Sequence, residues 1–273
     1  MGVQTKISWC DATWNPVTGC YHDCPYCYAR GIARRFGGCA DPEGAKEECR
    51  VLDSGHFLDL YELGQPLRAL HCERGEESRP APYPFCFAPT FHRYRLGEPA
   101  RWTRPRNIFV CSMADLFGDW VPEAWIKDVF AACQAAPWHR YLFLTKNPKR
   151  YLALHKDSEL PRGDGYWYGT TITNPDDLYY YAAPDLMLNT FLSIEPIMAP
   201  FNRSRVSPEH FPGWVIVGAE TGSRKEKVIP DKKWIDEIAA ACTEIGRPIF
   251  MKESLRTIMG PDFKQEWPWE VKQ

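Results

Sequence analysis

From about residue 107 onward, short apolar runs alternate with loops and helical stretches. Continuous apolar runs are typical of strands that are buried on both faces, as in a parallel sheet. With a first strand expected at residues 7–9, the pattern predicts about seven strands. The other six are expected at residues 108–111, 141–144, 166–172, 191–194, 214–217 and 249–251. This order of strands and helices favours an α/β fold with right-handed crossovers, either open or barrel-like.

Three helices are predicted from periodicity and end signals. Over residues 28–36, apolar residues recur every four positions on one face and arginines occupy the other side. A second helix begins at Pro122, a residue favoured in the first turn. A third runs from Asp231, a good N-cap, to Gly246, a good C-terminal stop. Residues 37–106 break this rhythm, so we predict one domain over residues 1–273 with an irregular insertion at about 37–106.

Bulk composition excludes several classes of protein. The formal net charge of −2 gives no argument for nucleic acid or a membrane surface. No apolar run approaches transmembrane length, and the first ten residues have no apolar core of a signal peptide. We therefore expect a cytoplasmic protein with no membrane partner. The eleven cysteines are an odd number, and Cys111, Cys133 and Cys242 lie in apolar patterns that predict small buried hydrophobes rather than disulfides.

Three further cysteines, Cys20, Cys24 and Cys27, have the spacing C-x3-C-x2-C, and tyrosines flank the last one. Three thiolates can hold three irons of a cubic cluster and leave the fourth iron open to bind a substrate or cofactor. A structural zinc site needs four closed ligands, and an electron-transfer cluster usually has a fourth cysteine. The motif therefore predicts a [4Fe–4S] cluster with an open iron. The alternatives are a zinc knuckle and a chance grouping of buried cysteines.

The spacing and the flanking aromatic residues resemble the cysteine motif of the radical S-adenosylmethionine superfamily. Tyr26 matches the aromatic residue that precedes the third ligand, and Tyr28 resembles the variant in spore photoproduct lyase. The chain as a whole is similar to a phage-associated branch of unknown function in that superfamily, many members of which have a longer gap between the first two cysteines. The matching stretches are TWNPVTGC (13–20), SMADLFG (112–118), LTK (144–146), SIEP (193–196) and VIVGAE (215–220).

The resemblance implies a partial (β/α) barrel of six to seven parallel strands, with Cys20, Cys24 and Cys27 as ligands of the cluster. It also implies S-adenosylmethionine as the cofactor, chelated by the fourth iron and cleaved reductively to a 5′-deoxyadenosyl radical that abstracts hydrogen from a substrate. An external reductant such as a flavodoxin or a ferredoxin is then a partner.

Polar residues follow the predicted strands, at the ends where ligands gather in such folds. By their place in the superfamily fold, Ser112 and Asp115 are expected near the amino group of the methionine. The ribose is expected near strands four and five. The candidates there are Thr171, Asn174, Ser193 and Glu195, and Tyr26 is expected beside the cluster. Glu220 and Lys252 are predicted to contact the substrate. Glu195 leaves a buried strand, so we expect Lys146 or Lys252 to pair with it. For each residue, helix capping or a solvated loop is the alternative.

The sequence constrains the identity of the substrate less than it constrains the cofactor. Residues 90–106 contain five arginines, Arg93, Arg95, Arg101, Arg104 and Arg106, interleaved with aromatic residues that could stack on bases. This stretch favours a nucleic acid or nucleotide substrate, with a solvated loop as its alternative. A peptide or small metabolite is the second hypothesis, and a zinc-binding interaction module without catalysis is the third. Four widely spaced cysteines of the insertion could hold a second metal: Cys39, Cys49, Cys72 and Cys86.

Overall fold

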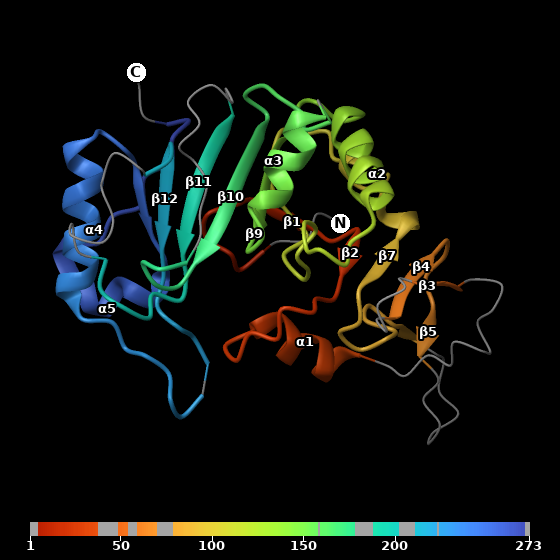
Figure 1. The fold of residues 1–273 in the computed structure, drawn as a ribbon, viewed down its shortest axis with the longest axis horizontal. Helices are drawn as coiled ribbons and strands as arrows, with labels where there is room; N and C mark the ends of the chain where they lie inside the picture. Colours follow the sequence, from red (N-terminus) through yellow and green to blue (C-terminus); the bar gives the residue numbers. More distant parts are fainter. Residues whose placement is uncertain are drawn as a thin grey trace. The chain divides into compact units, whose positions relative to one another are not determined.

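The computed structural model describes residues 5–37, 49–53, 59–69, 79–157, 159–177, 188–201, 211–222 and 224–270 (Figure 1). Seven strands form one sheet in the order β1-β8-β9-β10-β11-β12-β13. Their bounds are β1 Ala12–Trp14, β8 Asn107–Val110, β9 Arg140–Thr145, β10 Tyr166–Ile172, β11 Asn189–Ile194, β12 Trp214–Val217 and β13 Ile249–Met251. The pairs β1–β8, β10–β11, β11–β12 and β12–β13 are parallel. The predicted α/β fold with six to seven parallel strands is confirmed.

The predicted first strand at residues 7–9 is wrong, because the chain enters the sheet at Ala12 instead. Trp9 is nevertheless buried. Its ring lies 6.0 Å from that of Phe191 and 6.3 Å from that of Trp214. Trp9 therefore packs from a loop against the aromatic side chains of two strands, which gives it the burial of a strand residue without strand pairing.

Two compact units are distinguished in the chain. Of the described residues, those of Ala12–Tyr141 belong to unit 1, whereas Thr5–Asp11 and those from Leu142 onward belong to unit 2. The single-domain organisation inferred from the sequence stays a prediction.

Unit 1 contains a second sheet with the order β2-β7-β4-β3, which Figure 1 shows for β3, β4 and β7 lying side by side. The strands are β2 Val17–Thr18, β3 Cys49–Asp53, β4 Asp59–Leu63 and β7 Thr90–His92, and β5 Arg68–Ala69 pairs with β6 Arg79–Pro80. Two 3-10 turns follow, η1 Arg93–Arg95 and η2 Pro99–Arg101. The described parts of the predicted insertion are therefore more regular than its weak periodicity suggested.

Helix α2 (Glu123–Gln134) packs against this second sheet. The ring of Trp125 stacks on Phe91 with centroids 5.2 Å apart, and its Nε1 donates to Glu62 Oε1 at 2.6 Å. Arg93 Nε donates to the other oxygen of Glu62 at 3.1 Å, and Arg93 Nη1 donates to Asp128 Oδ2 at 2.8 Å. Because both oxygens of this buried carboxylate have partners, Glu62 joins the insertion to α2.

Unit 2 is built on β10–β13 with α3 (Lys149–Lys156), α4 (Lys232–Glu244) and α5 (Arg256–Met259), and with the turns η5 Glu253–Leu255 and η6 Gly260–Asp262. One hydrophobic core joins the sheet to α4, which contributes Ile235, Ile238 and Cys242. The predicted third helix and its N-cap are confirmed, since Asp231 Oδ1 accepts the backbone N–H of Lys233 at 2.9 Å.

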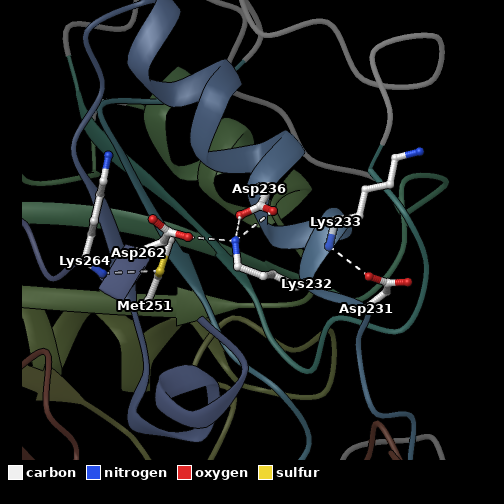
Figure 2. Close-up of polar contacts among 7 residues, drawn as sticks. All are labelled: Asp231, Lys232, Lys233, Asp236, Met251, Asp262 and Lys264. Carbon is white, nitrogen blue, oxygen red and sulfur yellow. Dashed lines mark hydrogen bonds and ion pairs between the residues drawn. The ribbon is translucent and has the colours of Figure 1, made fainter. Parts of the chain in front are cut away.

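Figure 2 shows how the first turn of α4 is held. Lys232 Nζ donates to Asp236 Oδ1 at 2.7 Å, one turn further along, and lies 2.9 Å from Asp262 Oδ2 of η6. The backbone N–H of Lys264 donates to the sulfur of Met251 in β13 at 3.4 Å. These contacts tie the helix start to the chain that leaves the last strand.

The chain beyond η6 packs against side chains of β12 and β13. Trp214 Nε1 donates to the carbonyl of Glu266 at 2.9 Å. The ring of Trp269 lies 5.3 Å from that of Trp214, and the ring of Trp267 lies 5.0 Å from that of Phe250. The residues that the structure describes include no helix that is both long and apolar enough to cross a membrane.

Candidate functional site: the cysteine loop and the strand ends

The cysteine loop lies in unit 1, between β2 and α1 (Tyr28–Phe36). The backbone of Gly19 has a φ of +88°, and a Cβ built there would lie 2.3 Å from the carbonyl oxygen of Ala88. Only glycine fits this close approach at positive φ. The N–H of Gly19 donates to Met113 O at 2.9 Å, and that of Cys20 donates to Phe87 O at 3.1 Å. The backbone therefore fixes the start of the loop.

All three cysteines of the loop are free and partly exposed. Cys27 is the N-cap of α1, where its sulfur accepts the N–H of Arg30 at 3.4 Å. Burial raises the pKa of Cys20 to about 12. The amide of His22 opposes this rise, and the charges of Asp115, Cys24 and Cys27 add to it.

Across the described part of the chain, no three histidine, cysteine or acidic side chains are grouped as ligands of a single metal ion. A cubic cluster sets its three thiolates on three different irons, so its ligands stand further apart than those of one zinc ion. The three cysteines of the loop nevertheless supply the donor type that an iron–sulfur cluster takes.

Asp115 is buried beside the loop. Its Oδ2 lies 2.7 Å from Nε2 of His22, and its Oδ1 accepts the backbone N–H of Phe117 at 3.0 Å. Both oxygens thus have partners in the chain, so the predicted contact with a cofactor amino group would have to share them.

Ser112 is also engaged close to the loop. Its hydroxyl donates to Asn15 Oδ1 at 3.1 Å, and the same oxygen accepts the N–H of Met113 at 3.0 Å. The Tyr28 hydroxyl donates to the carbonyl of Ser112 at 2.6 Å. Tyr26 is half-buried. Sequence reasoning missed Asn15, although an Asn-Pro pair directly after a strand is a turn signal that could have drawn attention to it.

In unit 2, Glu195 and Lys252 form the predicted ion pair at the ends of β11 and β13. Gly218, at the end of β12, leaves room for it, because a Cβ there would lie 3.0 Å from Lys252 Cδ and 3.1 Å from Glu195 Oε1. Thr171 and Ser193 are register partners in β10 and β11, so their side chains share one face of the sheet. Ser193 is buried and Thr171 is half-buried.

Asn174 closes a turn. Its Nδ2 donates to Asp177 Oδ1 at 2.8 Å, and its Oδ1 accepts the N–H of Asp176 at 3.0 Å. Burial raises the pKa of Asp177, but hydrogen bonds from Thr173 and Asn174 outweigh it, so that the pKa lies below its ordinary value. The side chain of Asn174 is therefore occupied by its own loop.

Glu220 is buried and has a partner that sequence reasoning missed. Arg224 Nε donates to Glu220 Oε1 at 2.6 Å, and Arg224 Nη2 donates to Oε2 at 2.7 Å. These two bonds hold the pKa of Glu220 below its ordinary value. The bidentate pair shapes the loop after β12, and the i, i+4 spacing was its only signal in the sequence.

The remaining predicted residues are placed as follows. Cys39 and Cys72 lie outside the described residues, Cys49 falls in β3, and Cys86 is exposed, so a second metal site stays a prediction. Cys111, Cys133 and Cys242 are buried, as predicted. Of the candidate residues, unit 1 contains Cys20, Cys24, Cys27, Tyr26, Ser112 and Asp115, and unit 2 contains Thr171, Asn174, Ser193, Glu195, Glu220 and Lys252.

The basic stretch divides into two groups. Arg93 is paired with Glu62 and Asp128, and Arg95 Nη1 donates to the carbonyl of Asn15 at 3.0 Å. Arg101 and Arg104 are exposed. A phosphate backbone would therefore meet the second group rather than the first.

Comparison with known proteins identifies the family. Residues 4–257 match the family described as protein of unknown function (DUF5131), so the chain belongs to that family. No curated protein matches the chain closely enough to count as a relative.

Two solved structures resemble the chain in fold. One is spore photoproduct lyase complexed with dinucleoside spore photoproduct, and the other is a cysteine-to-alanine mutant of spore photoproduct lyase with the same ligand. Each is 10% identical to this chain with a TM-score of 0.52, over 92% of this chain and 79% of that chain. This likeness supports the partial barrel that the sequence predicted.

Proposed function

We propose that this chain is a radical S-adenosylmethionine enzyme. The observation that carries the proposal is the cysteine loop: three free thiols at C-x3-C-x2-C spacing, with the last one capping α1. The likeness in fold to spore photoproduct lyase supports it, because the loop then stands on a scaffold that is compatible with this chemistry.

Cys20, Cys24 and Cys27 would hold a [4Fe–4S] cluster. Once bound, the cluster and S-adenosylmethionine supply a 5′-deoxyadenosyl radical that abstracts a hydrogen atom. The chain's own part is to hold the loop: Gly19 fixes its entry and Cys27 ends it at a helix N-terminus. In unit 2, Thr171 and Ser193 remain the better candidates for binding S-adenosylmethionine, whereas Glu195 and Lys252 would have to share their ion pair with a ligand. Asn174 and Glu220 have their polar atoms engaged within the chain.

For the substrate, we propose a nucleic acid or nucleotide, with a flavodoxin or ferredoxin as the electron donor. The dinucleoside ligand of the similar structure supports this class of substrate, as do the exposed Arg101 and Arg104. A peptide or a small metabolite is the second candidate, favoured by the slightly negative net charge of the chain.

The test is anaerobic reconstitution with iron and sulfide, followed by metal analysis and absorbance spectroscopy. We expect about four irons and four sulfides per chain, and loss of the visible absorbance in Cys24→Ala. Cys10→Ala is the matched control, because Cys10 lies in unit 2, off the loop, and belongs to neither predicted metal site. One zinc per chain without visible absorbance would contradict the proposal and favour an interaction module. Formation of 5′-deoxyadenosine by the reduced protein, accelerated by an added oligonucleotide, would identify the substrate class.

A further inference from the structure

Gly31 lies inside helix α1, at a position where the fold itself does not need a glycine. A Cβ built on Gly31 meets nothing within 4 Å, so close packing does not exclude a larger side chain. Its φ is not positive, so the backbone does not demand a glycine either. Glycine inside a helix lowers stability relative to alanine, because it loses more conformational freedom on folding. The bare backbone at Gly31 therefore points to a group from outside the chain that comes close to α1.

Four side chains surround this open position. On a helix surface, residues three and four positions apart are neighbours. Gly31 thus has Cys27 and Tyr28 before it and Arg34 and Arg35 after it. Tyr28, Gly31, Arg34 and Arg35 are all exposed, and together they form a surface that we call the Gly31 face. It combines an aromatic ring with two cations, and it begins next to the last cysteine of the loop.

The Gly31 face has an excess of positive charge. The sequence of α1 contains arginines but no acidic residue, and Arg30 pairs with Asp23. Within the part of the chain that the structure describes, Arg34 and Arg35 form no ion pair. Arginines in the last turn stabilise a helix by complementing its dipole, but exposed charges without partners also attract an anion. The charge of the Gly31 face is therefore complementary to a ligand with negative charge.

The ring of Tyr28 is both exposed and held in place. The side chain is 53% exposed, although its hydroxyl donates to the carbonyl of Ser112 at 2.6 Å. A ring that is already fixed binds a planar group at a lower cost in side-chain entropy than a mobile one. Aromatic side chains beside arginines bind nucleic acid in this way, by stacking on a base while the cations contact phosphate.

We propose that the Gly31 face binds one nucleotide of a single-stranded nucleic acid, with its base on the ring of Tyr28 and its phosphate at Arg34 and Arg35. The inference rests on the proposed function and deepens its substrate class. It adds a contact site that is separate from Arg101 and Arg104. A flat nucleotide suits a bare helix surface beside a fixed ring better than the side chains of a protein partner do.

The experiment fills the open position without harming the fold. Gly31→Glu places a carboxylate three and four residues before Arg34 and Arg35, so it neutralises them and should raise the midpoint temperature of unfolding. Binding of a labelled single-stranded DNA oligonucleotide to the anaerobically reconstituted chain is measured by fluorescence anisotropy. We expect affinity to fall about tenfold or more in Gly31→Glu. Gly64→Glu is the matched control, because Gly64 is exposed and equally open, and its affinity should equal the parent's.

Two further comparisons separate stacking from charge. Tyr28→Leu removes the ring and should weaken binding about tenfold, whereas Tyr28→Phe keeps the ring and should bind more tightly than Tyr28→Leu. Arg34→Gln combined with Arg35→Gln should reduce the slope of log K against log salt by about 1.4, because about two phosphate contacts are lost. This double variant also serves if Tyr28→Leu, next to Cys27, fails to assemble a cluster.

A parent chain that binds the oligonucleotide, with unchanged affinity in Gly31→Glu and in the double arginine variant, would overturn the site on α1 alone. The same holds if Gly31→Glu instead slows reduction of the cluster by a flavodoxin, since the face would then serve an acidic protein. A parent chain that assembles its cluster but binds no oligonucleotide would contradict the proposed substrate class and the inference with it. The two failures are therefore distinguishable from the parent alone.

Discussion

Lys252 Nζ and the carboxylate of Glu195 form an ion pair that bridges the ends of β13 and β11 across Gly218. The backbone supports this arrangement. Gly218 N donates to Ile194 O at 3.0 Å, and Lys252 N donates to Val217 O at 2.9 Å. The backbone hydrogen bonds between neighbouring strands thus continue beyond the strand ends and bring the side chains of Glu195 and Lys252 together. Each is less than a third exposed, so the pair is shielded from solvent more than a surface pair is.

The first prediction concerns the coupling of this pair. In a double-mutant cycle with Glu195→Gln and Lys252→Met, we expect a coupling free energy of about 1 kcal/mol in stability. The free energy of unfolding is measured by chemical denaturation for the parent, both single variants and the double variant. The pair Lys232 and Asp236 is the control, since it is an exposed i, i+4 contact worth about 0.4 kcal/mol. Strict additivity at Glu195 and Lys252 would show that the pair is not formed in solution.

The second prediction concerns His92, which is buried between Thr18 and Tyr94 in unit 1. Its Nε2 lies 2.9 Å from Thr18 Oγ1, and its Nδ1 lies 3.1 Å from the Tyr94 hydroxyl. Burial, and to a lesser extent the charge of Arg95, hold the pKa of His92 well below its ordinary value of 6.5. At pH 7.5 the imidazole is neutral in both states, so it makes no pH-dependent contribution there.

As the pH falls below about 6.5, the unfolded chain takes up a proton that the native His92 does not. The free energy of unfolding should therefore fall by up to about 1.4 kcal/mol per pH unit from this group. His92→Gln removes that contribution, so the variant should lose stability less steeply between pH 6.5 and pH 5. Denaturation at several pH values measures both slopes. Identical slopes in parent and variant would contradict the prediction.

Some parts of the fold could be predicted from the sequence and others could not. The parallel strands were predictable because each is an apolar run of its own, as in Trp214–Val217. The sheet of the insertion was not, because its strands are short and pair across long separations, as Val17 does with Phe91. At residues 7–9, ring packing of Trp9 produced the burial of a strand without its hydrogen bonds.

In the candidate site, too, some side-chain partners could be predicted from the sequence and others could not. The partner of Glu195 could be narrowed to two lysines, Lys146 and Lys252, because a carboxylate that leaves a buried strand needs a nearby cation, and the structure selects Lys252. The partners of Asp115 and Glu220 could not be narrowed in this way, because His22 and Arg224 are each one of many polar residues in loops. Which of these residues meet depends on the path of the loop backbone, and side-chain type alone does not determine that path.

The third prediction tests the orientation of α1. Its periodic apolar residues Tyr28, Ile32 and Phe36 are 53%, 36% and 57% exposed, whereas Ala29 and Ala33 are buried. The small residues thus form the packed face, unlike the pattern of an ordinary amphipathic helix. Ala33→Leu should cost about 1–3 kcal/mol of stability by overpacking. Ile32→Ala should change it by less than about 0.5 kcal/mol. Thermal unfolding of the two variants is the measurement, and the reverse ranking would mean that α1 packs through its large residues.

The fourth prediction separates two roles within the basic stretch. Arg101 and Arg104 are exposed, and they flank Trp102, whose carbonyl accepts the indole N–H of Trp138 at 2.8 Å. Charge reversal of both arginines should weaken binding of a labelled single-stranded oligonucleotide. It should also reduce the slope of log K against log salt by about 1.4, because about two phosphate contacts are lost. Fluorescence anisotropy at several salt concentrations measures this, with Arg162→Glu as an exposed control in unit 2.

Arg93→Glu should behave differently, although it lies in the same stretch. Arg93 neutralises the buried Glu62 and also contacts Asp128, so charge reversal would place three carboxylates together. We expect a loss of folding stability of about 3 kcal/mol or more, because a buried charge loses its partner. Oligonucleotide affinity per folded molecule should stay close to the parent's. Salt-independent or absent binding by the parent would argue against a nucleic acid and favour a small substrate.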